Sequence, residues 1–394
     1  MDGTVNIYMR PIEGVTVTID LDSIKIVGFL DRIKVPAPKG DGTDYRGSQQ
    51  SPPFSPSLNR ITSVQPDGPS FTLSGHLVRW GSWEFHLGFD VRAGTIISLA
   101  SVLDVDKGNF RRVLYRGYIL ELFVPYMDLT EEWYYRTFFD AGEYGLGLSA
   151  VPLQPSTDCP ANAVFLDAYL AAHDGSPVKM SNVFCIFERY AGDILWQHTE
   201  VGIPGKVITE VRPEVSLVVR MVSTVANYDY IVDWEFTQSG SIRLKVQTYH
   251  ICVVCCLWLV LVNLILVGLT GLLKVRGSVY THMDQISDEE YGILVAENTI
   301  GSRHDHFLTY HLDLDIDGEA NSFLKLTLQM TKVDAQESPR RSYWKVISEK
   351  AKTESDARIR LGLDQAELLF VNPSKRTRVG NTIGYRPTAS RILC

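Results

Sequence analysis

Alternating and β-branched apolar runs dominate the chain and favour β-strands over helices. Short runs at residues 5–10 and 15–20 are interrupted by Gly14 and end before Asp22, which is typical of strands joined by turns. Residues 80–89 are rich in aromatic side chains, 215–225 carry repeated valines, and 230–236 are again β-prone. With no repeat period and no convincing long amphipathic helix, we predict a mainly β protein built around a large antiparallel β-sandwich.

Changes in composition divide the chain into three parts. Residues 36–75 hold seven of the 18 prolines with many serines and glycines, which predicts an extended linker. Residues 1–35 are too short to close a domain of their own. Residues 76–394 are expected to form the main β-sandwich domain.

One segment departs from the strand pattern. No charged residue lies between Lys245 and Lys274, and residues 251–262 are uninterrupted apolar side chains. With its flanks this run is long enough for a membrane helix, although Asn263 and Gly268 weaken that interpretation. A non-enzymatic product anchored to a membrane through residues 251–273 is therefore one hypothesis.

Composition adds limits on partners and compartment. The net charge of −8 leaves no broad cationic face for phosphates, so nucleic acid is not expected as a partner. No basic and apolar leader follows Met1, and the sequence does not define a compartment. Among the six cysteines, only Cys159 and Cys185 look like a possible disulfide.

Three short motifs carry candidate chemistry. His304 and His306, spaced i and i+2, would point to one face of a strand and could chelate a metal ion, or could be an accident of a strand surface. Residues 313–318 begin like a calcium loop, but Leu324 stands at the closing position, so an EF-hand is rejected; a looser cation site and solvated acidic residues both stay open. Asp140 lies beside small residues and by itself indicates a turn.

Taken together, these residues resemble one family. The motif Thr224-x-x-Asn227-Tyr228-Asp229, with His304-x-His306 downstream and Asp140-x-Gly142-Glu143 upstream, is similar to that of the copper- and topaquinone-containing primary amine oxidases, and residues 184–193 are similar to the plant branch. The resemblance covers most of residues 4–385. It implies that residues 1–35 are the remnant of a small α+β domain and that residues 76–394 are an incomplete catalytic domain.

The resemblance also implies roles for named residues. Tyr228 would be the topaquinone precursor that forms a Schiff base with the amine, and Asp140 the proton acceptor. Tyr126 would orient the quinone, with Asn227 and Asp229 holding the ring's position. The implied copper ligands are His304 and His306. A second cation, calcium or manganese, would be bound by Asp313, the Leu314 carbonyl and Asp315. The implied disulfide joins Cys159 and Cys185.

The implied activity is oxidation of primary mono- or diamines by O₂ to aldehyde, ammonia and hydrogen peroxide, in a homodimer located in the apoplast or the peroxisome. Two departures from the family change the expectation for this chain. The third copper histidine is expected beyond residue 394, so the chain as written is predicted to be inactive. An insertion is expected at about residues 244–265, interpreted as a translated intron rather than a membrane span.

Overall fold

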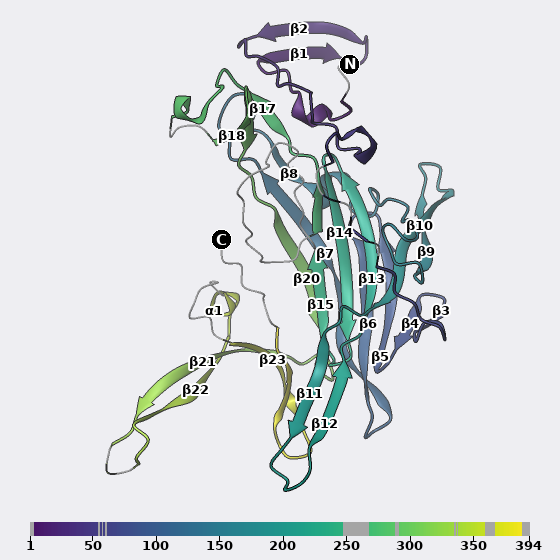
Figure 1. Cartoon of the computed structure of the whole chain (residues 1–394), viewed down its shortest axis with the longest axis vertical. Coiled ribbons are helices and arrows are strands. Elements are labelled where there is room, and N and C mark those ends of the chain that lie inside the picture. The colour runs from purple at the N-terminus through teal and green to yellow at the C-terminus, as the bar shows by residue number, and fades with distance from the viewer. Residues whose placement is uncertain are drawn as a thin grey trace.

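The computed structural model describes residues 4–53, 56, 58–59, 61–246, 268–287, 291–334, 336, 338–358 and 367–387. Two long antiparallel sheets lie face to face along most of the molecule (Figure 1). The first follows the order β15-β14-β13-β10-β9, with β16 also on β14, and the second the order β20-β7-β6-β5-β4-β3, with β8 also on β7. This arrangement confirms the predicted mainly β fold.

The strands of these two sheets span most of the chain. The first sheet contains β9 (Val164–Ala171), β10 (Pro177–Arg189), β13 (Ser216–Val225), β14 (Tyr228–Thr237), β15 (Ile242–Val246) and β16 (Gly268–Gly271). The second contains β3 (Thr72–Ser74), β4 (Leu77–Trp80), β5 (Trp83–Asp90), β6 (Gly94–Asp104), β7 (Asn109–Pro125), β8 (Thr137–Phe139) and β20 (Phe307–Leu314).

The core fills the space between the two sheets. Phe85 of β5 stacks on Phe236 of β14, with ring centroids 4.0 Å apart, and the Trp83 indole donates a hydrogen bond to the Thr237 carbonyl. Inward residues alternate with outward ones along the strands, as Tyr228, Tyr230 and Val232 do on β14. Because the first two of these line the candidate site, the core and the site share one face of β14.

The β14 strand has two partners on the same edge, one continuing the other. Val232 pairs with Val246 at the end of β15, and the next residue, Ile231, pairs with Gly268 at the start of β16. Gly268 therefore occupies the rung that directly follows Val246, although residues 247–267 stand between them in the sequence. The expected insertion at about 244–265 falls mostly on those residues, which lie outside the described part of the chain.

A membrane anchor finds no support in the described residues. No helix among them is long and apolar enough to cross a membrane. Of the hypothesised span 251–273, residues 251–267 lie outside the described residues, while Gly268–Gly271 form strand β16. The end of the apolar run therefore completes a β-sheet.

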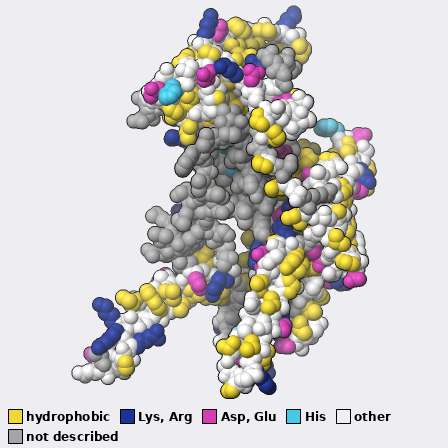
Figure 2. All heavy atoms as spheres, viewed as in Figure 1, with side chains coloured by type: hydrophobic (Ala, Val, Ile, Leu, Met, Phe, Trp, Pro, Cys, Tyr) yellow, Lys and Arg dark blue, Asp and Glu magenta, His cyan; other side chains and the backbone are white. Residues whose placement is uncertain are grey.

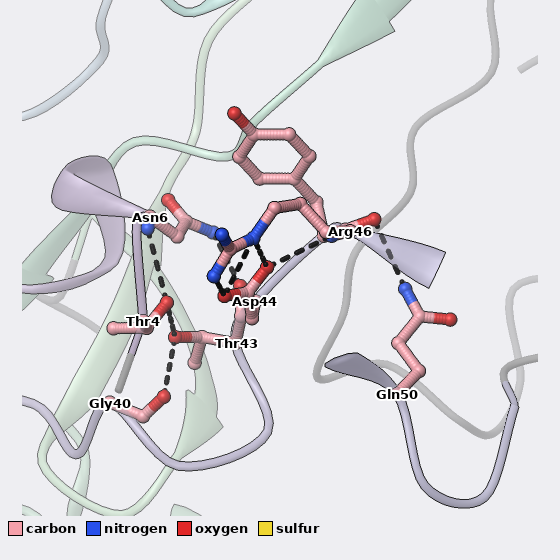
Figure 3. A network of polar contacts seen from close by, with 8 residues as sticks. Thr4, Asn6, Gly40, Thr43, Asp44, Arg46 and Gln50 are labelled. Atoms are coloured by element: carbon pink, nitrogen blue, oxygen red, sulfur yellow. Dashed lines mark hydrogen bonds and ion pairs between the residues drawn. The ribbon is translucent and has the colours of Figure 1, made fainter. Parts of the chain in front are cut away.

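Hydrogen bonds connect the N-terminal residues to the loop at residues 40–46 (Figure 3). The Asn6 amide donates to the Thr43 carbonyl at 3.0 Å, the Thr43 hydroxyl donates to the Gly40 carbonyl at 2.7 Å, and Arg46 forms an ion pair with Asp44 at 2.6 Å. Residues 36–50 therefore include a packed turn and are not only a spacer. The strand predicted at 5–10 is wrong: a 3₁₀ turn, η1 (Ile7–Met9), lies there, whereas the run at 15–20 is strand β1.

Several hairpins and small sheets surround the sandwich. Figure 1 shows β1–β2 beyond one end, β11–β12 extending from the other, and β21–β22 projecting sideways as an arm. The remaining elements are β1 (Val15–Asp20), β2 (Lys25–Asp31), β11 (Ile194–Glu200), β12 (Ile208–Pro213), β17 (Val275–Gly277), β18 (Gly292–Ala296), β19 (Thr299–Ser302), β21 (Ser322–Lys332), β22 (Ser342–Lys350), β23 (Glu367–Arg376), β24 (Thr382–Tyr385), η2 (Gly47–Gln49), η3 (Asp140–Tyr144), η4 (Met283–Gln285) and α1 (Glu354–Ala357).

Candidate active site

A tight hairpin turn places Tyr228 at the start of β14. Val225, the last residue of β13, pairs directly with Tyr228, so only Ala226 and Asn227 form the turn. Ala226 adopts a positive φ of 53°, as the favoured two-residue hairpin turns require at their first central position. The Tyr228 side chain then points into the sandwich and is only 4% exposed.

The turn is clamped by residues from β16 and just beyond it. The Asn227 side-chain amide donates a hydrogen bond to the Leu272 backbone carbonyl at 2.7 Å. The Leu272 backbone N–H donates to the Asn227 backbone carbonyl, also at 2.7 Å. Gly271, with φ of 133°, allows this approach, because a Cβ at that position would lie 2.2 Å from the Asn227 carbonyl oxygen and 2.8 Å from Tyr228 Cα. Asn227 therefore holds the backbone that carries Tyr228.

Two hydrogen bonds fix the Tyr228 hydroxyl. It lies 2.8 Å from the Tyr126 hydroxyl and 2.6 Å from His304 Nε2. Because His304 Nδ1 lies 3.1 Å from the Ser302 carbonyl, which only accepts, a neutral imidazole carries its proton on Nδ1 and accepts from Tyr228 at Nε2. Tyr126 then donates to Tyr228. Burial raises the pKa of Tyr126 to about 12 and that of Tyr228 further, so both phenols are neutral.

A second set of hydrogen bonds joins His306 to Asp140. Tyr230 is two residues after Tyr228 on the same face of β14, and its hydroxyl donates to Asp140 Oδ2. The same hydroxyl lies 3.1 Å from His306 Nδ1, which is then the protonated nitrogen. The two imidazole rings lie 5.3 Å apart, and the His306 ring packs edge-on to Tyr228 at 4.6 Å. In the neutral form, these contacts place the proton on Nδ1 of both histidines and the lone pair on Nε2.

Asp140 is a buried carboxyl group on a π-helical turn, η3. Glu121 of β7 holds this turn by accepting hydrogen bonds from the Ala141 and Gly142 amides at 2.9 and 3.2 Å. Burial raises the pKa of Asp140 to about 6, with smaller contributions from Glu143 and Glu121, while the hydrogen bond from Tyr230 lowers it. A carboxyl group that titrates near neutral pH is suited to accept a proton.

The site opens into a small cavity that contains one acid and one base. Asp140 and Lys274 supply the charges, and Tyr126, Phe138, Tyr144 and Tyr228 supply aromatic walls. Asp229, by contrast, does not line this cavity: it accepts a hydrogen bond from Thr224 at 2.6 Å across the hairpin. Asp229 therefore supports the position of Tyr228 indirectly, by stabilising the hairpin turn.

The proposed metal ligands differ in how the structure arranges them. The rings of His304 and His306 are neighbours, with centroids 5.3 Å apart. His304 lies just before β20 in a bridge to Tyr126 rather than inside a regular strand. Asp313 is exposed, the Leu314 carbonyl accepts from Asn321 at 3.0 Å, and Asp315 pairs with Arg112 at 3.4 Å. Within the described ranges no group of three His, Cys, Asp or Glu side chains is placed to hold a metal ion. The second cation site stays a prediction.

The disulfide between Cys159 and Cys185 is present. It lies in a small core cluster with Leu153, Phe187 and Val218, behind the sheet that carries Tyr228. The suggested pairing is therefore confirmed. Cys252, Cys255 and Cys256 lie outside the described residues.

Comparison with known proteins identifies the family. The family model "Copper amine oxidase, enzyme domain" matches residues 72–256 and 264–392. The chain is 50% identical over its whole length to the peroxisomal copper-containing amine oxidase alpha 2 of Arabidopsis thaliana and 49% identical, over 98% of its length, to a primary amine oxidase of Pisum sativum, covering 56% and 54% of those proteins. The chain belongs to the copper amine oxidase family and spans about half the length of the curated relatives it matches.

Solved structures support the fold. The crystal structure of a copper-containing benzylamine oxidase from Hansenula polymorpha matches with a TM-score of 0.76 at 21% identity, over 99% of this chain and 57% of that one. An amine oxidase from Aspergillus nidulans matches with a TM-score of 0.75. At this identity the likeness concerns the fold alone.

Sequence reasoning missed several residues of the site, among them Tyr230, Gly271, Leu272 and Lys274. Tyr230 has a signal, since Tyr228-x-Tyr230 has the spacing that places two side chains on one face of a strand. Gly271, Leu272 and Lys274 have none, because they follow the long apolar run and reach the Tyr228 turn only through the pairing of β16 with β14.

Proposed function

We propose that the site is that of a primary-amine oxidase. The reaction converts a primary amine, O₂ and water to an aldehyde, ammonia and hydrogen peroxide. The observation that carries the proposal is the position of Tyr228, whose hydroxyl is held by Tyr126 and His304 while the carboxyl group of Asp140 lines the same cavity. A buried tyrosine beside two neighbouring imidazoles fits the formation of a quinone at a copper centre.

The residues present fit the expected groups in part. Imidazole nitrogens suit copper, and the Ser302 carbonyl orients His304 in the way that neighbouring acceptors orient metal-binding histidines. When present, topaquinone supplies an electrophilic carbonyl for the amine nitrogen. His304 and His306 are the two ligands we assign, and the described part of the chain brings no third His, Cys, Asp or Glu to them.

The chain's own residues have separable tasks. Asp140 accepts the proton removed from the carbon next to the amine nitrogen, a role that contributes about 10²- to 10⁴-fold. Tyr126 fixes the orientation of residue 228 through a bond of 2.8 Å. Asn227 and Asp229 hold the hairpin turn, so that the reacting ring and the Asp140 carboxyl group keep their separation.

The test is aerobic loading of the full chain with copper, with and without added imidazole to serve as a third ligand. Two imidazoles are expected to hold copper weakly, so quinone staining and peroxide release with amine should appear or increase with imidazole. Tyr228→Phe should abolish both signals. Retained copper with no quinone in either condition would contradict the proposal, as would a signal that survives Tyr228→Phe.

The β21–β22 arm supports the proposal of a homodimer. Cross-strand pairs Leu328 with Val346 and Met330 with Trp344 form one apolar face, with 63%, 56%, 53% and 66% of these side chains exposed. Figure 2 shows hydrophobic side chains along this arm, away from the body of the protein. An exposed apolar face of this kind is stabilised by burial, and a second copy of the chain would bury it in a homodimer interface. Sedimentation should show a dimer that Trp344→Glu dissociates; a monomeric wild type would contradict this.

For the compartment we propose the peroxisome or the apoplast. The support is that one relative is named a peroxisomal enzyme and others are plant primary amine oxidases. A fluorescent fusion expressed in plant cells would discriminate the two. Diffuse cytosolic fluorescence would argue against both.

A further inference from the structure

The cavity beside Tyr228 is lined by side chains of both charge signs. Among the described residues that line it, Asp140 and Lys274 are the two that carry a charge, and the others are aromatic, apolar or amide side chains. The proposed reaction places the amine nitrogen of the substrate between Tyr228 and Asp140. The cavity is small, and a substrate tail that leaves Asp140 along its wall would pass the other lining residues, of which Lys274 is the charged one.

Lys274 is held in place on both sides. Leu272, two residues before it, is locked to Asn227 by the two 2.7 Å hydrogen bonds, and Val275, directly after it, is fully buried at the start of β17. The backbone that carries the Lys274 side chain is therefore fixed at the wall of the cavity.

The surroundings of Lys274 are aromatic. Its Nζ lies 5.0 Å from the Phe138 ring centre, 5.6 Å from Tyr126 and 6.0 Å from Tyr8. Among the described residues no carboxylate forms an ion pair with this ammonium group. Burial, and then repulsion from Arg136, lower the pKa of Lys274, while Asp140 acts in the opposite direction. The charge is thus poorly solvated and acts strongly on neighbours.

We propose that Lys274 is a specificity-determining residue that selects amines with an aromatic, apolar or anionic tail and disfavours α,ω-diamines. A second ammonium group on the substrate would approach the Lys274 ammonium in a partly buried space, where repulsion is weakly screened. An aromatic tail would instead pack on Phe138 and Tyr126. The inference rests on the proposed function, because it assumes that the reacting amine lies at Asp140.

The test compares 2-phenylethylamine with 1,4-diaminobutane. Calorimetry on the copper-free full chain measures binding without any chemistry. The value of kcat/KM, measured on protein loaded with copper in the presence of imidazole, reports selection during turnover. We expect the aromatic amine to be preferred by about tenfold or more, Lys274→Met to remove most of that preference, and Lys274→Glu to reverse it. Lys274→Arg, which keeps the charge, and Lys206→Met, at the exposed tip between β11 and β12, should both retain it.

The outcomes are separable. A preference that is absent in the wild type, or unchanged by Lys274→Met, overturns the inference. Equal losses for both amines in Lys274→Met would indicate a structural role and would also overturn it. If neither amine is turned over by protein loaded with copper in the presence of imidazole, the proposed function fails, while the binding ratio still decides whether Lys274 discriminates between the tails.

Discussion

The hydroxyl of Tyr230 donates a hydrogen bond to Oδ2 of Asp140 while lying 3.1 Å from Nδ1 of His306. One side chain on β14 thus connects the proposed proton acceptor with a proposed copper ligand. Tyr228, two residues earlier on the same face, connects Tyr126 with His304 in the same manner. The protonation of Asp140 should therefore depend on Tyr230 as well as on burial.

Asp140 is expected to set the acid limit of activity. Burial raises its pKa to about 6, and Tyr230, Glu143, Glu121 and Lys274 are the titratable groups that act on it. Since the base must be ionised, kcat/KM should rise as the pH rises through about 6. Asp140→Asn should lose about 10²- to 10⁴-fold in activity at pH 8. An acid limit that stays in place when Asp140 is replaced would contradict this.

The same substitution should stabilise the fold. A carboxyl group whose pKa is raised from 3.8 to about 6 on folding contributes stability that is present below pH 3.8 and is lost as the pH rises through about 6. Asp140→Asn removes this loss, so its free energy of unfolding at pH 8 should exceed that of the wild type by about 1–3 kcal/mol. Urea titrations at pH 8 and pH 3.5 check this, because the difference should vanish at the lower pH.

Tyr230→Phe should move the acid limit to higher pH. The hydrogen bond from Tyr230 favours the ionised carboxylate and lowers the pKa of Asp140. Without that bond, the pKa of Asp140 should rise further, because burial still raises it. The measurement is the pH dependence of kcat/KM. Tyr310→Phe is the control, because Tyr310 is a largely buried tyrosine on β20 that makes no contribution to the Asp140 pKa. The same displacement in both variants would sink the prediction.

Gly271→Ala should disturb Tyr228 without touching its side chain. The new Cβ would meet the Asn227 carbonyl oxygen at 2.2 Å, at a φ of 133° that side chains rarely adopt. We expect a loss of about 2 kcal/mol or more in the free energy of unfolding and less quinone per copper. Gly47→Ala is the control, since nothing lies within 4 Å of a Cβ there. Equal behaviour of the two variants would show that the clamp is not tight.

The sequence predicts the parts of the site that lie in short local motifs, but not those that come together only through the pairing of strands distant in the sequence. Tyr228 is recognisable through the motif Thr224-x-x-Asn227-Tyr228-Asp229, which resembles that of the family. His304 and His306 are recognisable through their i, i+2 spacing, although His304 lies just before β20. Lys274 is not, because its approach depends on one strand continuing another across residues 247–267. The strand predicted at 5–10 failed for a related reason, since the Asn6 bond to Thr43 fixes a 3₁₀ turn against local β propensity.

The pairing of β14 leads to the last prediction, on the proposed insertion. Val246 and Gly268 occupy successive rungs, so deleting residues 247–267 should join β15 and β16 into one strand without changing any pairing. Closing a loop of this length costs about 2–3 kcal/mol, which the deletion would recover. We expect a higher thermal midpoint, more soluble protein and no loss of quinone formation with copper and imidazole.

A deletion that is one residue shorter, 247–266, tests whether the register is the cause. Val267 would then occupy the rung of Gly268, so that either a bulge forms or every later side chain turns to the opposite face of the sheet. Gly271 would no longer face Asn227, and the clamp on the Tyr228 turn would be lost. The two deletions should therefore differ clearly in thermal midpoint and in quinone formation. If they behave alike, or if the 247–267 deletion unfolds the protein, residues 247–267 are not an insertion into a single strand.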